Sequence, residues 1–438
     1  MINAIEISPH QPGTVYLAVT GYKLNDFKSY IYKTADYGKR WKRIDAGLPG
    51  DTFVRVVRED PARKGQLYAG TEAGMFVSFD DGGNWHSLDL NLPPVPITDL
   101  AIRQDTLVAA TQGRGFWTLD DLFMVRAAAQ GLGDQPLQLF APGTSAQTIK
   151  RGWSSEEFEA DNPDRGVPLY YYLEKDLEEP LSIEILDADG QSVRVYSSEE
   201  GDFESCLLHN MDPRSPYEPE YPSAKAGLNK WNWDTRRQGF HCVKDITLFA
   251  GLEGASVPPG DYRARITAGA DTREVSFRLE LDPRLTATRD EINEWAARVD
   301  EASALLQDVL NSLGALRKSR GHIAGLMADY PQDAAFQEAG QKALVAIDAW
   351  DHQIIQPLHE TLEDEDAWKT MLAGQIRFVL DVIDYTGAPV AEGTLLRLSD
   401  LQSQWAALEA RRDIIRSEQI EPINTWARDQ GIPHVRGD

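Results

Sequence analysis

Short apolar runs, each ending in threonine, recur through the first part of the chain. They lie at Thr14–Thr20, Gln66–Thr71 and Thr106–Thr111. Such runs are typical of β-strands. A period of roughly 40 to 50 residues with several short strands is that of one blade of a β-propeller. We therefore predict that residues 1–125 form terminal propeller blades.

A turn motif follows each of the first two runs. The pattern Ser/Thr-x-Asp-x-Gly-x-x-Trp begins at Thr34 and again at Ser78, 44 residues later. In such a hairpin turn the Asp accepts backbone N–H bonds, the Gly supplies a positive φ, and the Trp packs beneath the turn. The residues with this predicted structural role are Thr34, Asp36, Gly38, Trp41, Ser78, Asp80, Gly82 and Trp85.

This motif resembles the Asp-box (BNR) repeat of sialidases, some glucanase propellers and sortilin-type receptors. In those families the box lies on the blade rim, so the resemblance implies that Asp36 and Asp80 are not catalytic acids. A third repeat, 97–121, lacks the box. Its Thr-Gln-Gly-Arg-Gly-Phe-Trp-x-Leu-Asp-Asp stretch is similar to the segment that closes the propeller in large secreted bacterial proteins with sortilin-like repeats, which are often labelled glycosyl hydrolases.

Two and a half blades cannot close a ring of roughly four or more. Either N-terminal blades are missing from this chain, which we favour, or its strands pair with another chain. An open blade edge invites association, because unpaired N–H and C=O groups are a template for another strand. We therefore predict self-association through the edge near Thr14–Thr20 if nothing else covers it.

The middle segment, residues 136–285, changes to longer alternating runs. Leu181, Ile183 and Ile185 face one side of a half-buried strand that ends in an Asp-Ala-Asp-Gly turn. Further strands are predicted at Ser192–Tyr196, Lys230–Thr235, Tyr262–Ala268 and Glu274–Leu281. The order of Asn-Pro-x-x-Gly, this strand, Asn-Lys-Trp-Asn-Trp-Asp and Pro-Pro-Gly-Asp-Tyr resembles the fibronectin-like domain that follows the propeller in the same bacterial family. We therefore expect a β-sandwich.

Two pairs of residues in this segment are candidates for a special role. Trp231 and Trp233 fall on the same side of a predicted strand, where they are either core residues or a platform that stacks on a glycan. Cys206 and Cys242 bracket a proline-rich loop, so they are either a disulfide that closes it or two unpaired core thiols.

The last segment, residues 286–438, has helical periodicity throughout. Thr288 and Glu291 form a capping box ahead of a long amphipathic helix. Further helices are predicted from Asp333 to about Leu362, over Glu365–Tyr385 and over Ala391–Gln430. Pro422 is expected to break the last of these. We predict a helical bundle or coil, a kind of tail with which the same bacterial family also ends.

The formal net charge of −25 falls mostly after the first segment: residues 1–139 carry about −2, 140–285 about −11 and 286–438 about −12. Such acidity repels phosphate backbones and anionic lipid, which argues against a nucleic-acid or membrane-surface partner. No signal peptide or membrane span is visible. An extracellular or cell-envelope location is implied by the resemblance alone.

No catalytic motif stands out. The Phe/Tyr-Arg-Ile-Pro signature of sialidases is absent, as are Gly-x-Ser-x-Gly, the P-loop, His-Glu-x-x-His and Cys-x-x-Cys. His352, His359 and Asp348 do not make a convincing metal site, and we expect neither metal nor cofactor. The fold expected is a multidomain β plus α protein. Its expected function is non-catalytic binding of a protein or glycan partner; the alternative is the accessory C-terminal part of a propeller-type glycoside hydrolase.

Overall fold

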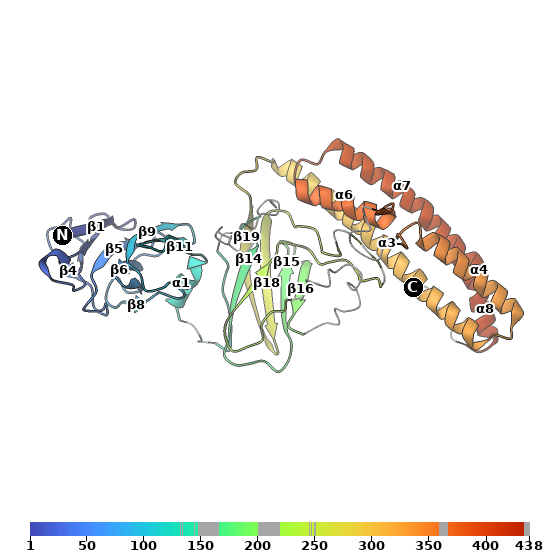
Figure 1. Ribbon diagram of the computed structural model, residues 1–438, viewed down its shortest axis with the longest axis horizontal. Coiled ribbons are helices and arrows are strands. Elements are labelled where there is room, and N and C mark those ends of the chain that lie inside the picture. Colours follow the sequence, from blue (N-terminus) through green and yellow to red (C-terminus); the bar gives the residue numbers. More distant parts are fainter. Residues whose placement is uncertain are drawn as a thin grey trace.

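The computed structural model combines several small β-sheets with a helical region (Figure 1). This confirms the mixed β plus α class. The described residues are 1–131, 133, 135–143, 145–147, 166–199, 220–244, 246, 248, 251–358 and 367–432. The sheets of the N-terminal part lie at one end of the molecule, the sheets of the middle part follow, and the helices extend at the other end (Figure 1).

The described residues 1–131 contain three antiparallel sheets, which follow one another along the chain. The first sheet is built from β1 (Ile2–Ile7), β2 (Val15–Val19), β3 (Ile31–Thr34) and β4 (Lys42–Arg43). The second is built from β5 (Val54–Glu59), β6 (Leu67–Thr71), β7 (Gly74–Ser78) and β8 (His86–Ser87). The third is built from β9 (Ile97–Arg103), β10 (Thr106–Thr111) and β11 (Phe116–Leu119).

Each of these sheets is ordered as its strands follow in sequence, so every connection is a hairpin. β2 therefore has a partner on both sides, β1 and β3. The prediction of an unpaired edge near Thr14–Thr20 is wrong in this detail, because the preceding segment Ile2–Ile7 pairs with it and β1 itself is the edge strand. A short 3₁₀ turn, η1 (Tyr22–Leu24), lies in the long β2–β3 connection.

Helix α1 (Leu122–Ala128) follows the third sheet and ties it to the second. Arg126 donates to both carboxylate oxygens of Asp60, at 2.9 and 3.2 Å, and also pairs with Asp105. Asp60 is fully buried and accepts a further bond of 3.0 Å from the Tyr68 hydroxyl. A buried carboxylate is stable only when it is paired in this way, so the network holds the end of the sheet series in place.

The described middle part contains two sheets that share one hydrophobic core. One sheet has the order β12 (Leu137–Leu139), β14 (Val167–Leu173) and β17 (Gly227–Trp233). The other has the order β13 (Ser145–Gln147), β19 (Asp271–Leu281), β18 (Gly260–Ala268), β15 (Leu181–Leu186) and β16 (Ser192–Ser197). Leu181, Ile183 and Ile185 are fully buried in the core, as their alternation predicts.

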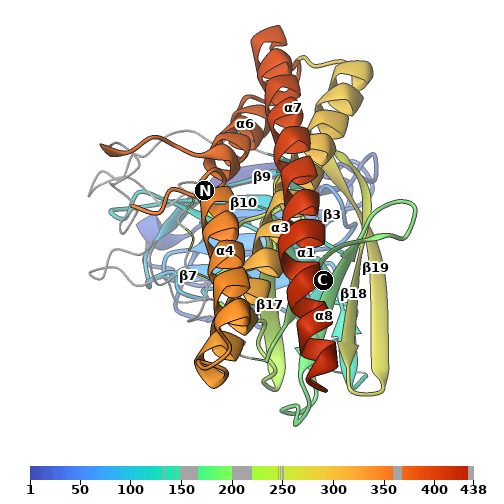
Figure 2. The same cartoon turned by 90° about the vertical axis from the view of Figure 1, so that its right-hand side faces the viewer.

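The described part of residues 286–438 contains five α-helices. Their bounds are α3 (Arg289–Asp329), α4 (Ala334–Asp351), α6 (Leu372–Thr386), α7 (Glu392–Ile415) and α8 (Glu421–Asp429). The predicted capping box is present, since the Thr288 and Glu291 side chains each bond the other's backbone N–H. α7 and α8 run along one line beside α3 and α4 (Figure 2). None of the described helices has the length and apolar character needed to cross a membrane.

Two helix predictions need correction. The second helix ends at Asp351 rather than near Leu362, because the chain turns there to bury Ile354 and Ile355 in the helical core. The third begins at Leu372 rather than Glu365. Pro422 does not break the last helical line: it lies in the first turn of α8, where no backbone N–H donor is needed, after a π-helical turn, η2 (Arg416–Ile420).

Candidate functional sites

The two turns predicted as Asp boxes, which we call the box turns, contain the hydrogen bonds expected from their sequence. Asp36 Oδ1 accepts from the Arg40 backbone N–H at 2.9 Å, and the Gly38 N–H donates to Thr34 Oγ1 at 3.0 Å. The corresponding distances in the second turn, from Asn84 to Asp80 and from Gly82 to Ser78, are 2.8 and 2.9 Å. The glycines have φ values of 84° and 82°, a region in which a Cβ is disfavoured.

Bonding to backbone N–H groups lowers the pKa of both box carboxyls. For Asp36 the main cause is the Arg40 N–H, and for Asp80 it is the Asn84 N–H. A carboxylate used in this way closes its own turn and is not available for acid–base work on a substrate. The geometry therefore agrees with a structural role for both boxes.

The tryptophans of the two boxes differ sharply in environment. Trp85 is only 4% exposed, and its indole N–H donates to the Ile44 carbonyl oxygen of the first sheet at 2.7 Å. Trp41 is 43% exposed. The residue that would correspond to Ile44 lies 44 positions earlier and so is not in this chain. The tryptophan of this motif thus anchors the second sheet on the first, whereas in the first sheet it is an exposed indole.

One face of the first sheet shares this exposure along its edge strand: Ile2, Ile5 and Ile7 are exposed, whereas Val15, Leu17 and Tyr32 are half-buried. Ile5, Leu17 and Tyr32 stand directly opposite one another across β1, β2 and β3, so their side chains share a face. Ile5 is 61% exposed. We call this surface the start face. Trp41 is included because its equivalent, Trp85, is buried together with Val57, Ala69 and Phe76 of the second sheet. Its residues are Ile2, Ile5, Ile7, Val15, Leu17, Tyr32 and Trp41.

The corresponding face of the second sheet is buried. Strand register places Val57, Ala69 and Phe76 in the positions of the Ile5 row. All three are buried in a cluster that also contains Tyr16, Ala18, Ile31 and Ile44 from the opposite face of the first sheet. Two sheets of this repeat therefore pack by laying a start face against the opposite face of the preceding sheet.

Polar contacts at the edge of this interface fix its register. The Tyr16 hydroxyl of the first sheet donates to Asp81 Oδ1 of the second at 2.8 Å, and the Lys33 ammonium pairs with the same carboxylate. Asp81 follows the box aspartate directly. The equivalent residue of the first box is Tyr37, which is 78% exposed.

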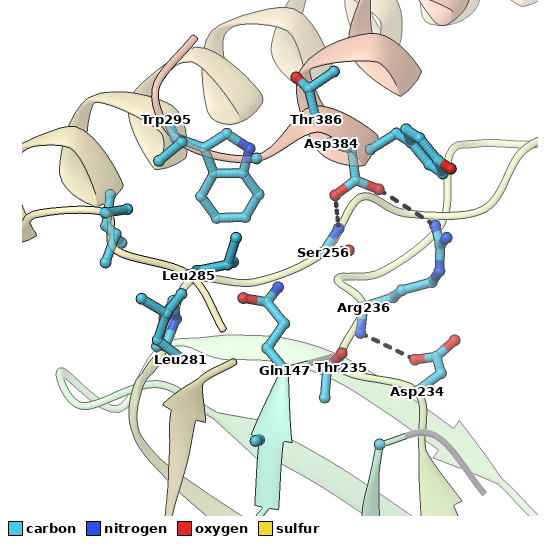
Figure 3. A pocket seen from close by; sticks show the side chains of 18 residues that line it. Gln147, Asp234, Thr235, Arg236, Ser256, Leu281, Leu285, Trp295, Asp384 and Thr386 are labelled. Carbon is cyan, nitrogen blue, oxygen red and sulfur yellow. Dashed lines mark hydrogen bonds and ion pairs between the residues drawn. The ribbon is translucent and has the colours of Figure 1, made fainter. Parts of the chain in front are cut away.

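A pocket of about 240 Å³ lies between the middle sheets and the helical region (Figure 3). Its apolar wall comes from the end of β19, the segment after it and the start of α3: Leu281, Leu285, Ile292 and Trp295. Its polar wall comes from the ends of β13 and α6 and from two loops: Gln147, Asp234, Arg236, Ser256 and Asp384. The Trp295 indole N–H is not available to a ligand, because it donates to the Ile383 carbonyl at 2.8 Å.

The charged groups of this pocket bind one another. The Asp384 side chain is 3% exposed and accepts from the Ser256 backbone N–H at 3.0 Å. The Arg236 guanidinium lies 3.9 Å from Asp384 and donates to the Gly254 carbonyl at 2.7 Å. The dashed contacts in Figure 3 show Asp384 turned toward Ser256 and Arg236. This arrangement is that of a clamp joining the helices to the middle sheets, with an apolar space beside it.

The loop after β17 positions Arg236. Asp234 accepts from the Arg236 N–H at 3.0 Å, Thr235 has a φ of 59°, and the buried Trp233 indole donates to the Arg236 carbonyl at 3.0 Å. Trp233 is fully buried against Tyr262 and Phe277. Of the two predicted alternatives for Trp233, the structure agrees with a core residue, because a ring enclosed on all sides cannot stack on a sugar.

Trp231 lies on the same face of β17 as Trp233 and packs half-buried against the same core, where its ring meets Tyr196 edge-on with the ring centroids 5.0 Å apart. The Tyr196 hydroxyl in turn donates to Asp234 at 3.3 Å. The two tryptophans therefore share one side of the strand, as predicted, and that side faces the core. Sequence spacing predicts the shared side, but it cannot show how completely each ring is covered.

Other predicted residues fall partly outside the described region. Cys242 is disulfide-bonded, whereas Cys206 lies outside the described residues. Asp348 pairs with Arg320 at 2.5 Å, and His359 also lies outside the described residues. Among the residues that the structure describes, no group of three or more His, Cys, Asp and Glu side chains is placed to hold a metal ion.

No protein-family model and no curated protein matches this chain. Among solved structures, it is similar to PorZ, a bacterial surface component of the type-IX secretion system of Porphyromonas gingivalis, at 12% identity and a TM-score of 0.23, over 63% of this chain and 30% of that one. It is also similar to the GH74 xyloglucanase from Xanthomonas campestris, at 14% identity and a TM-score of 0.23, over 68% of this chain and 40% of that one. A further similar structure is YCF48 from Cyanidioschyzon merolae, at 12% identity and a TM-score of 0.19, over 65% of this chain and 85% of that one.

These likenesses span less than half the length of the first two proteins. TM-scores near 0.2 mean that the backbones do not superimpose as wholes, so no argument about this chain rests on them.

Proposed function

We propose that this chain is a non-catalytic binding protein of the sortilin-like Asp-box class. Its N-terminal sheets are terminal propeller blades, its middle part is a fibronectin-like sandwich, and its helices form an interaction tail. It recognises a protein or glycan partner, and its location is extracellular or in the cell envelope. The closed box turns and the face-to-face packing of the first two sheets support the assignment of blades.

The observation that carries the binding function is the start face. It exposes several large apolar side chains of one sheet, among them Ile5, Ile7 and Trp41. The equivalent surface of the second sheet is buried against a neighbour. Contiguous apolar surface of this kind marks an interaction site, because leaving it in water is unfavourable.

The pocket beside α6 supports binding rather than hydrolysis. A glycosidase needs two carboxyl groups free to act across one glycosidic bond. Asp384 accepts a hydrogen bond from the Ser256 backbone N–H and pairs with Arg236. Asp234 accepts from the Arg236 backbone N–H and pairs with Arg194. Both carboxylates therefore serve the protein's own contacts.

A direct assay separates the two functions. The full chain is incubated with xyloglucan and with a sialylated glycoprotein, and released reducing ends and sialic acid are measured beside affinity electrophoresis in the same polysaccharide. We expect no release of product. Hydrolysis that disappears in Asp384→Asn but persists in the matched surface variant Asp381→Asn would replace this proposal with a hydrolase.

A further inference from the structure

The start face has a definite complement, and the contact between the first two sheets shows what it is. There, the start face of the second sheet meets Tyr16, Ala18, Ile31 and Ile44 of the sheet before it. The partner surface is thus the opposite face of another sheet of this repeat. It also provides a carbonyl directly after its fourth strand, as Ile44 does after β4, to accept the indole N–H.

Building on the proposed function, we infer that the start face binds a further four-stranded Asp-box sheet that is not among residues 1–438. A second copy of this chain does not qualify. The outward face of its third sheet does carry an apolar residue, Phe116, which is 80% exposed. That sheet has three strands among the described residues, however, and the chain passes from β11 into α1. It has no fourth strand from which a carbonyl could reach Trp41.

Tyr37 further restricts the partner. In the existing interface the ammonium of Lys33 is neutralised by Asp81. On the start face the equivalent of Asp81 is Tyr37, whose side chain is uncharged. A lysine of the partner sheet at the position of Lys33 would be desolvated there without gaining a counter-charge. The partner sheet is therefore one with an aliphatic residue there, as the second sheet has in Val77.

The test extends the full chain with such a sheet. A copy of residues 53–95 is placed directly before Met1, so that Met1 takes the position of Pro96 and Leu88 of the copy takes the position of Ile44. Hydroxyl-radical oxidation of the peptide that carries Trp41 is then measured by mass spectrometry. We expect the oxidation rate of Trp41 to fall several-fold, toward that of Trp85 in the parent chain, and Ile5→Asp in the extended chain to restore it.

The register is tested by a matched pair of changes. Val77→Lys within the copied segment alone should return Trp41 most of the way to its parent oxidation rate. Adding Tyr37→Asp should restore protection, because it recreates the pairing of Lys33 with Asp81. Leu24→Asp, at an apolar residue that is 87% exposed in η1 and outside the start face, should change nothing.

Trp41 oxidised at the parent rate beside a folded added sheet would overturn the inference. So would an added sheet that stays unfolded by circular dichroism, since a true complement would stabilise it. Protection that appears in the unextended chain only as concentration rises would make a second copy the occupant, against the inference. None of these results bears on the hydrolysis assay, so the failure of the binding surface and the failure of the proposed function are distinguishable.

Discussion

The two box tryptophans provide a matched pair for one quantitative prediction. Trp85→Phe removes the donor to the Ile44 carbonyl, at present 2.7 Å away, and part of a ring that is 4% exposed. A buried carbonyl left without its partner costs about 1–3 kcal/mol, and the lost ring volume adds about 1 kcal/mol. Trp85→Phe should thus destabilise the second sheet by about 2–4 kcal/mol. Trp41→Phe, at 43% exposure, should cost less than about 0.5 kcal/mol.

The measurement must be local, because a chain with several cores does not unfold in one step. Native-state hydrogen exchange of peptides from β5 to β7, followed by mass spectrometry, reports the opening of this sheet. At tenfold per 1.4 kcal/mol, Trp85→Phe should lower protection there by roughly thirty- to a thousandfold. Equal losses in the two variants, or no loss in Trp85→Phe, would refute the reasoning that the indole bond and its burial anchor the second sheet on the first.

Three further predictions follow from the same structure. Backbone bonding lowers the pKa of Asp36 and Asp80 in the folded state, so their contribution to stability is present above the unfolded pKa of about 3.9 and is lost as pH falls through the lower folded values. Hydrogen-exchange protection of both turns, taken relative to the intrinsic rate at each pH, should therefore fall below about pH 4. Asp36→Asn should weaken this pH dependence in its own turn. Asp384→Ala leaves buried Arg236 without its nearest buried carboxylate and should cost about 3 kcal/mol, seen as a lower melting temperature. Asp261→Ala, at the exposed pair with Arg278, should cost under about 1 kcal/mol. Thr288→Ala should cost about 1 kcal/mol and increase exchange in the first turn of α3.

Much of the local structure could be predicted from the sequence because its causes are local. The box turns depend on contacts four residues apart, as between Asp36 and Arg40, and on glycines with positive φ. The capping box at Thr288 joins residues three positions apart. The alternation of Leu181, Ile183 and Ile185 follows from the period of a strand. Each of these features closes its own hydrogen bonds or buries its own stripe, so a short window contains the necessary information.

The environment of each tryptophan could not be predicted in this way. Trp41 and Trp85 occupy the same motif position, yet one is exposed and the other buried, because only the second has a preceding sheet to pack on. Trp231 and Trp233 lie on one face of the same strand, and only the packing of Tyr262 and Phe277 against Trp233 decides that this ring is fully buried while Trp231 is half-buried. The helix ending at Asp351 is a further case, since the burial of the two isoleucines after it competes with continued helix.

The sequence by itself determined the repeats, the turn chemistry, the strand and helix periodicities and the concentration of negative charge after the first segment. Only the tertiary structure decided which sheet faces are covered and which carboxylates bind groups of the protein itself. It also decided that a pocket forms where Asp384 of α6 meets Arg236 after β17. The physical reason is range. Turns and periodicities arise from contacts within a few residues, whereas burial and ion pairing join groups that are far apart in sequence, such as Ile44 and Trp85 or Ser256 and Asp384, and that only folding brings together.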